Sequence, residues 1–439
     1  MKNILLLLIC FCFYSIPLVA QKTLLEKAEF HLAIEQTDSA IYYYKLALKQ
    51  DLNNQDLKAK LANIYRMTNH PKEAVLLFKE LCKSSESDYI LNYWWYAYCL
   101  KMSGKYRKSR KILAFIKTMD YLKNETAIIS NIDQAINSCN FAIQNKQKKR
   151  TYTIQNEQMV NSSAADFAPI FYQKNIYFAS KRIIKTAHGY SDPNTDFIYV
   201  ANRKNNGQLD SMRPLHDATS FNIFFQSNFA PFSISKDGKT IFCSYNLFGA
   251  TVRHPYIADL KEATDASAFE MNYQSIDNLT KLLSTMSTLF PYFARLCGFP
   301  HLSADGKTLY FSGKNLPGIS YGGYDLYVCY LENGTWSTPT NLGPNINTFA
   351  DEISPFVDEE GILYFASDAH LGFGGFDIFS SVQKKGIWQK PSNLGVPVNS
   401  AQDDLYFIFD TKNGLGYFSS NRKGGKGGYD LYSLKKKGK

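Results

Sequence analysis

Three aspartates recur in one local pattern, and their carboxylates are the groups in this sequence most suited to chemistry. Asp325, Asp377 and Asp430 each follow Gly-Gly and an aromatic residue, at intervals of 52 and 53 residues. Such carboxylates could bind a metal ion or act as acids. One aspartate per repeat, always beside a glycine turn, instead favours a structural role, because an Asp side chain accepts hydrogen bonds from turn N–H groups. We therefore predict that the three residues stabilise blade turns.

Two other motifs match catalytic signatures only in part. Ser233 to Lys236 has the Ser-x-x-Lys spacing of some acyl enzymes, but a predicted Asp-Gly turn follows it directly. Arg422 to Gly428 is glycine-rich like a phosphate-binding loop, but it lacks the Gly-Lys-Ser/Thr ending and a following helix. The seven histidines form no pair at metal-ligand spacing. Without a nucleophile, a base and an orienting group, the sequence predicts no enzyme, no metal site and no cofactor.

The aspartates belong to a longer repeat of short apolar segments, which must position them. Before each Gly-Gly turn stands one such segment: LYFSG at 309–313, LYFAS at 363–367 and GYFSS at 416–420. A second apolar segment begins at each aspartate. A period near fifty residues, built from short strands, is typical of the blades of a β-propeller.

The number of repeat starts and one displaced segment predict the propeller's topology. Five starts predict five blades: Pro169, Pro231, Pro300, Pro355 and, in degenerate form, Phe407. Residues 151–161 match the last strand of a blade, because Asn161 precedes Pro169 by eight residues, as Asn347 precedes Pro355. We therefore expect this strand to complete the final blade and close the ring, which removes exposed strand edges. An apolar-rich insertion at 280–297 is either a binding loop or a cap over the core.

Residues 21–145 show helical periodicity instead. Two series of small residues recur every 34 or 35 positions: Ala28, Ala62 and Ala97, and Ala40, Ala74 and Ser109. Small side chains at this period allow paired helices to approach closely, and the pattern resembles tetratricopeptide repeats. We expect three repeats and a capping helix near 125–144, then a linker at 146–150 and an all-β propeller at 151–439. The fold class is thus an α-helical solenoid followed by a five-bladed propeller.

Four large aromatic residues crowd one predicted inner helix of the solenoid: Tyr89, Tyr93, Trp94 and Tyr96. Any one of them could fill the core between helices, but four in eight positions cannot all face inward. Rigid aromatic side chains are common anchors in protein interfaces. We predict that some of them line a concave groove that binds a peptide or a partner helix.

The N-terminus and the overall composition indicate an exported protein. Lys2, the apolar run 4–13 and Leu18-Val19-Ala20 form a secretory signal over residues 1–20. No later stretch is long enough to span a membrane. The six remaining cysteines have neither disulfide-framework nor zinc-site spacing, so we expect mostly free, buried thiols, with one pair in the helical domain as an alternative. The net charge of +10 is not clustered, which argues against a nucleic-acid partner.

The repeat motifs resemble those of a known family. LYFSG…GGYDLYV, LYFASD…GGFDIFS and GYFSSNRKGGKGGYDLY resemble WD40-like (PD40, TolB-type) propeller repeats. The whole mature chain is similar to exported Bacteroidetes proteins that place tetratricopeptide repeats before such a propeller. Many of these continue into a peptidoglycan-binding OmpA-like domain, which we do not expect here, and one belongs to the type IX secretion machinery.

The resemblance and the two interaction folds together imply a binding function. We expect a non-catalytic scaffold in the periplasm, or at the periplasmic face of the outer membrane, that binds envelope proteins through its helical groove and propeller face. Envelope assembly or secretion would be its setting. The alternative is a module that binds or senses glycan or peptidoglycan through the propeller.

Overall fold

The computed structural model describes residues 23–32, 36–83, 89–122, 124–148, 150–183, 185–186, 189–190, 196–214, 232–234, 240–246, 253–261, 270–272, 297–316 and 318–437. The chain divides into two compact units, residues 1–140 and 141–439. The predicted signal segment lies outside the described residues, as does almost all of the insertion at 280–297. Among the described helices, none is both long and apolar enough to cross a membrane.

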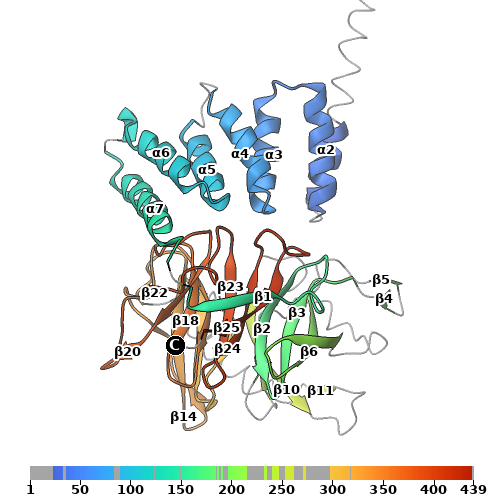
Figure 1. Cartoon of the computed structure of the whole chain (residues 1–439), viewed down its shortest axis with the longest axis vertical. Coiled ribbons are helices and arrows are strands. Elements are labelled where there is room, and N and C mark those ends of the chain that lie inside the picture. The colour runs from blue at the N-terminus through green and yellow to red at the C-terminus, as the bar shows by residue number, and fades with distance from the viewer. Residues whose placement is uncertain are drawn as a thin grey trace, which may run out of the picture. The chain divides into compact units, whose positions relative to one another are not determined.

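The N-terminal region is helical, as predicted, and consecutive helices pack against one another from α2 to α6. Residues 23–32 are helical. The further helices are α2 (Thr37–Gln50), α3 (Gln55–Met67), α4 (Pro71–Leu81), α5 (Tyr89–Met102), α6 (Tyr106–Lys117), the short η1 (Asp120–Leu122) and α7 (Thr126–Asn145) (Figure 1). Two of them begin with recognisable signals. Asn54 accepts the N–H of Leu57 at 3.0 Å before α3, and Pro71 opens α4.

The predicted series of small residues lies at the helix contacts. Its five alanines are fully buried: Ala28, Ala40, Ala62, Ala74 and Ala97. The sixth position, Ser109, is also buried, and its hydroxyl donates to the carbonyl oxygen of Ala97 at 2.6 Å. A buried serine costs little stability when its hydroxyl is hydrogen-bonded, which explains why serine can stand where alanine is usual.

Four cysteines are free and buried in the described part of the chain: Cys82, Cys99, Cys139 and Cys329. Burial raises the pKa of the Cys82 and Cys99 thiols to about 12. Because the thiolate is the reactive form, these side chains act as small apolar core groups. The expectation of free, buried thiols is confirmed at these positions.

The C-terminal unit consists of antiparallel sheets. The described strands form five sheets: β2 (Asp166–Tyr172), β3 (Asn175–Ser180), β6 (Phe197–Arg203) and β7 (Leu209–Pro214); β8 (Phe232–Ile234), β9 (Thr240–Asn246), β10 (Arg253–Lys261) and β11 (Glu270–Asn272); β12 (Cys297–Leu302), β13 (Thr308–Lys314) and β14 (Tyr324–Glu332) with β15 (Thr335–Trp336) and β16 (Thr340–Asn341); β17 (Glu352–Val357), β18 (Leu363–Ser367), β19 (Asp377–Ser381) and β22 (Ser392–Asn393); and β23 (Asp404–Asp410), β24 (Leu415–Ser420), β25 (Asp430–Lys436) and β1 (Tyr152–Asn156). Two ribbons pair β4 (Lys185–Thr186) with β5 (Gly189–Tyr190) and β20 (Gln383–Lys384) with β21 (Ile387–Trp388).

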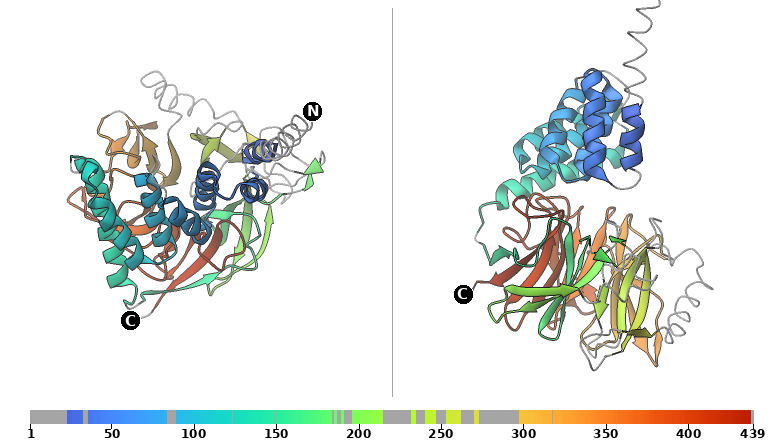
Figure 2. Two further views of the ribbon diagram at one scale, coloured as in Figure 1. Left: turned by 90° about the horizontal axis from the view of Figure 1, so that it is seen from above. Right: turned by 90° about the vertical axis from the view of Figure 1, so that its right-hand side faces the viewer.

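The first strand of each sheet faces the same central axis. These inner strands contact one another in the cyclic order β2, β8, β12, β17, β23 and back to β2. The last sheet is completed by β1, which pairs antiparallel with β25 from Tyr152↔Lys436 to Asn156↔Tyr432. Figure 2 shows green β1 beside the red C-terminal strands. The unit is therefore a β-propeller, and the predicted pairing of the N-terminal strand with the final sheet is confirmed.

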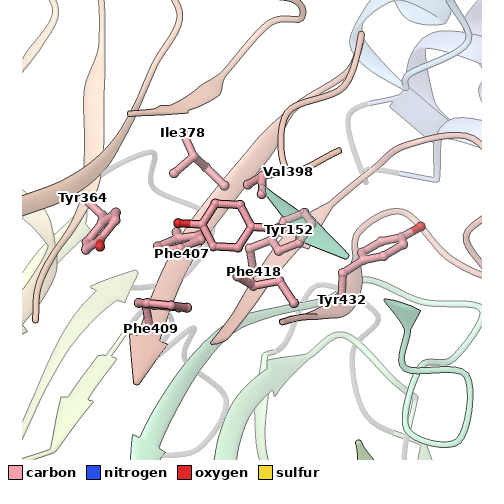
Figure 3. Close-up of a cluster of buried hydrophobic side chains, with 9 residues drawn as sticks. Tyr152, Tyr364, Ile378, Val398, Phe407, Phe409, Phe418 and Tyr432 are labelled. Carbon is pink, nitrogen blue, oxygen red and sulfur yellow. The ribbon is translucent and has the colours of Figure 1, made fainter. Parts of the chain in front are cut away.

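The apolar core of the propeller lies between neighbouring sheets. Figure 3 shows one cluster, between the last two sheets: Tyr152, Tyr364, Ile378, Val398, Phe407, Phe409, Phe418 and Tyr432, with Leu434. Tyr152 comes from β1, so the closing strand contributes to this core as well as to the sheet. Full burial of one such large apolar side chain contributes about 1.5–3 kcal/mol.

The Gly-Gly pairs mark close approaches between segments. A Cβ atom on the first glycine of each pair would lie about 2 Å from a backbone carbonyl oxygen: 2.2 Å for Gly322 and Phe349, 2.0 Å for Gly374 and Gln402, and 1.7 Å for Gly427 and Ala164. No side chain fits in that space. The repeated glycine is therefore required because the connection to the next sheet passes directly over it.

Two sheets begin with a buried ion pair. Asp404 at the start of β23 is fully buried, and its Oδ1 lies 2.5 Å from Nη2 of Arg422. Asp166 at the start of β2 is also fully buried and pairs with Arg182 at 3.0 Å. Each guanidinium lies over two aromatic rings of its own sheet: Phe418 and Tyr432 for Arg422, and Phe178 and Tyr199 for Arg182.

The sheet that begins with β17 has a different arrangement at the same place. Fully buried Glu352 accepts hydrogen bonds from Thr348 N at 2.6 Å and from Ser367 Oγ at 2.7 Å. Ala369 stands at the arginine position, since its N–H donates to Ser367 Oγ as that of Arg422 donates to Ser420 Oγ. Without an arginine beside it, burial raises the pKa of Glu352 to about 8.

His370 makes the contacts with aromatic rings and a carbonyl oxygen that Arg422 makes in the sheet of β23. Its ring lies 5.9 Å from Phe365 and 5.2 Å from Phe379, the aromatic pair of this sheet. Its Nε2 donates to the carbonyl oxygen of Ile346 at 2.8 Å, as Arg422 donates to that of Val398. Burial lowers the pKa of His370, which favours the neutral imidazole.

Candidate functional site

The three repeated aspartates hold turns. All are buried, and each accepts N–H groups from the residues just before it. The bonds run to Asp325 from Tyr321 at 2.9 Å, to Asp377 from Phe373 at 2.7 Å and Gly374 at 3.0 Å, and to Asp430 from Lys426 at 2.7 Å and Gly427 at 2.9 Å. Within the described ranges, no group of three or more His, Cys, Asp or Glu could hold a metal ion.

Asn161 and Asn347, which the repeat spacing relates, and Asn399 at the equivalent position bind the residue that follows each aspartate. The side-chain amide of Asn399 accepts the N–H of Ile378 at 2.8 Å and donates to its carbonyl oxygen at 2.8 Å. Asn347 binds Leu326 in the same way, and Asn161 binds Leu431. Each asparagine thus substitutes for one residue of a neighbouring strand. The spacing identified these residues, but only the structure shows what they bind.

The predicted aromatic residues of α5 lie in different surroundings. Tyr93 is half-buried, with its ring 5.2 Å from Phe115 of α6. Tyr96 packs at the edge of the core between α3, α4 and α5, and burial raises its pKa. Trp94 is half-buried, and the side chain of Tyr89 lies outside the described part. Sequence reasoning omitted Trp95, whose ring lies 3.8 Å from the guanidinium of Arg66 on α3.

A groove of about 770 Å³ lies in the helical unit, away from these aromatics. Its lining comes from residues 23–32, from Tyr44 of α2 and from one side of α3: Leu25, Glu29, Leu32, Asn54, Asp56, Leu57, Ala59, Lys60, Asn63, Ile64 and Met67. Glu29 and Lys60 form an ion pair of 2.6 Å across it. Met67 is 72% exposed at its edge. A lining that combines apolar and polar side chains suits an amphipathic segment of another chain.

A second concave site, of about 440 Å³, lies at the axis of the propeller. All five inner strands contribute to its walls, and the lining consists of 168–173, Ser233, 299–304, 354–359 and 406–413, with Arg203 at the end of β6. Each long segment runs from a buried or half-buried position to an exposed hairpin turn. The volume falls in the range of about 300–1,000 Å³ that is typical of small-molecule sites.

The buried end of this axial cavity has unusual backbone geometry. Four non-glycine residues adopt left-handed conformations at equivalent places: Ala168 (φ 52°), Phe299 (56°), Ser354 (51°) and Tyr406 (54°). Each coincides with a bulge in the pairing of its inner strand. Left-handed non-glycine residues each cost of order 1 kcal/mol and concentrate at functional sites. The side chains share this end, where the Tyr406 ring lies 6.0 Å from Phe299.

The charged side chains around the axial cavity form two ion pairs, and one further acid is held by neutral donors. Lys412 lies 2.5 Å from Glu359, and Arg203 lies 3.4 Å from Asp410. Buried Asp358 accepts four hydrogen bonds, from Glu360 N, Ile362 N, Tyr364 Oη and Thr411 Oγ1. No charge in the described lining is therefore left without a partner.

One histidine lines the same cavity. His301 Nε2 donates to the carbonyl oxygen of Val357 at 3.2 Å, and its ring lies 4.8 Å from Phe356. Burial lowers the pKa of His301 to about 4, so the imidazole is neutral near pH 7. Because Nε2 carries the hydrogen, Nδ1 presents a lone pair. The sequence marked Ser233 only as part of a Ser-x-x-Lys motif, and it gave no signal for His301 or the bulges, because the cavity forms only when distant strands converge.

No protein-family model matches the chain. No curated protein matches it either. Among solved structures it is similar to a putative TolB from Agrobacterium tumefaciens, with 15% identity and a TM-score of 0.34, over 62% of this chain and 79% of that one. It is similar to a thermostable family-43 glycoside hydrolase, with 13% identity and a TM-score of 0.39, over 63% and 93%. A puromycin-hydrolyzing peptidase from Mycobacterium tuberculosis matches with 13% identity and a TM-score of 0.29, and this chain spans only 44% of its length.

These comparisons contradict the prediction that the chain is not an enzyme. Most of the similar structures are hydrolases, including the peptidase, the glycoside hydrolase and a prolyl oligopeptidase from Galerina marginata. The prediction rested on the absence of known linear motifs. In a propeller, reactive side chains can converge from several inner strands, and no linear motif records that arrangement. At these identities the likeness concerns the fold alone and assigns no activity or substrate.

Proposed function

We propose that this chain is an exported binding scaffold that holds a segment of an envelope protein in the groove of its helical unit. In this proposal the helices are tetratricopeptide-type repeats and the five sheets are the blades of a five-bladed propeller. Its place is the periplasm or the periplasmic face of the outer membrane. The exposed apolar edge of the 770 Å³ groove is the observation that carries the proposal.

The contacts between alternate helices support a continuous binding face. The Glu29–Lys60 ion pair joins residues 23–32 to α3, and the Arg66–Trp95 contact joins α3 to α5. These three helices therefore stand in one row, although α2 and α4 lie between them in sequence. A partner segment in the groove can extend along this row toward the aromatic residues of α5. Apolar side chains of the partner would bury Leu32 and Met67, which are 37% and 72% exposed.

The test replaces one apolar residue at the groove edge with a charged one. Met67→Glu in the full chain should abolish capture of the partner from crosslinked native envelopes, because a buried carboxylate without a counter-charge opposes binding. Leu76→Glu is the matched control, since Leu76 on α4 is 65% exposed but does not line the groove. Capture that survives Met67→Glu, or that both variants lose equally, would overturn the proposal.

A further inference from the structure

The axial cavity of the propeller has a chemical character that the scaffold proposal does not use. Its walls combine apolar and aromatic surface with a nearly equal share of polar surface. Its buried end is formed by bulges in four inner strands, and its other end opens at exposed hairpin turns. The ligand must satisfy both the charges and the hydrogen-bonding groups of this lining.

The charges of the lining exclude an ionic ligand. Its acidic and basic side chains are already used, by the Glu359–Lys412 and Arg203–Asp410 pairs and by the four donors to Asp358. In the described walls a charged ligand would find no ionic side chain free to bind it, because Asp358, whose partners are all neutral, already accepts four hydrogen bonds. Burial of an unpaired charge is strongly unfavourable. The described part of the lining therefore favours an uncharged molecule.

The polar groups of the lining exclude a purely apolar ligand. Ser354 Oγ accepts the N–H of Tyr406 at 3.2 Å, and Ser233 Oγ accepts the N–H of Leu302 at 3.1 Å. Each hydroxyl can still donate its own hydrogen. His301, on the inner strand between those of the two serines, lines the same cavity and has a lone pair on Nδ1. A ligand without hydroxyl groups would leave two donors and one acceptor unpaired, and such a mismatch strongly disfavours binding.

We propose that the axial cavity binds the ring of a neutral sugar. The ring's apolar face would pack against the half-buried aromatic residues Phe356 and Tyr406, which line the cavity. Its hydroxyl groups would accept hydrogen bonds from Ser233 and Ser354 and donate one to His301. The volume of about 440 Å³ accommodates one or two such rings. This inference is independent of the helical groove and stands even if the scaffold proposal fails.

The first measurement is binding of the full chain to an array of neutral, uronic-acid-containing and amine-bearing oligosaccharides. The expected result is binding confined to neutral glycans. Equal binding to acidic or amine-bearing glycans would overturn the proposal, and so would the absence of any neutral ligand. Indole serves as a neutral aromatic competitor without hydroxyl groups. If indole competed as effectively as the sugar itself, the assignment of hydrogen-bonded hydroxyls would be overturned.

Two histidine variants locate the site. His301→Phe keeps the ring but removes the Nδ1 acceptor, and it should weaken binding of the best neutral glycan about tenfold, the effect of one hydrogen bond near 1.4 kcal/mol. His370→Phe is the matched control, because His370 is also packed between aromatic rings and bonded to a carbonyl but lies outside the cavity. Thermal unfolding confirms that both variants fold. Unchanged affinity in His301→Phe, or an equal loss in His370→Phe, would place the glycan elsewhere.

Discussion

The sheets that start with β23 and β17 each bury an acidic side chain at the start of the inner strand, but they stabilise it in different ways. Asp404 is held by Arg422 at 2.5 Å, whereas Glu352 has Ala369 at the arginine position and His370 over the rings. The first arrangement buries two charges that compensate each other. The second favours a protonated acid, because the pKa of Glu352 is raised to about 8. One sheet can therefore have a pH-dependent stability although its backbone has the same structure as the other repeats.

The largest effect is expected where one charge of a compensated pair is removed. Arg422→Leu leaves Asp404 fully buried without its counter-charge and should lower the free energy of unfolding by about 3–5 kcal/mol. Urea unfolding measures this. Lys412→Leu is the control, since it breaks the exposed Glu359–Lys412 pair and should cost less than about 1 kcal/mol. Similar decreases in the free energy of unfolding in both variants would show that the buried pair contributes no more to stability than the exposed pair.

The second effect is a pH dependence that arises from Glu352. Its pKa is raised from 4.5 in the unfolded chain to about 8 in the fold, so the folded state binds more protons between these values. Stability is therefore highest below pH 4.5 for this group and falls as the pH rises toward 8, by a few kcal/mol. Glu352→Gln should flatten this fall when unfolding is followed from pH 5 to pH 9. A wild-type slope that persists in Glu352→Gln would assign it to another group.

The smallest effect comes from converting one arrangement into the other. The double variant Ala369→Arg, His370→Ala introduces an arginine beside Glu352. Its position corresponds to that of Arg422 beside Asp404. The new guanidinium should stabilise ionised Glu352 and recover about 1–2 kcal/mol at pH 9, the size of a hydrogen bond to a charged group. Unfolding at pH 9 and pH 5 measures it. A variant that is less stable than the wild type at both values would show that the site cannot accommodate the larger side chain.

The repeated local motifs made much of the propeller predictable. Asp377 and Asn399 lie at fixed distances from their glycine turns, and their bonding partners are close in sequence or in the same repeat. The displaced segment ending at Asn161 carried the same spacing, so the pairing of β1 with β25 could be inferred. Fixed offsets thus predicted strand order, although they could not show why Gly374 must be glycine, since its neighbour Gln402 belongs to the next connection.

The candidate sites were less predictable because each is formed by residues that are distant in sequence and come together only in the fold. The left-handed conformation of Tyr406 coincides with a bulge in the pairing of β23 with β24, and a tyrosine gives no local signal for it. Ser233 and His301 belong to different repeats and meet only at the axis. In the helical unit, the aromatic residues of the sequence predicted a groove at α5. The groove is instead lined by residues such as Glu29 and Lys60, which lie on two neighbouring helices. The residues that form a cavity are seldom neighbours in sequence.

The antiparallel pairing of β1 with β25 determines how the propeller would respond to mechanical force. Tyr152 at the start of β1 lies opposite Lys436 at the end of β25, and Thr153 Oγ1 donates to the carbonyl oxygen of Lys435 across 282 residues. A tension applied between the helical unit and the chain beyond Lys436 would pull on the two strands at the same end. Their hydrogen bonds would then break one after another, as in unzipping, rather than all at once in shear. The seam that completes the propeller is therefore also where it would first open under load.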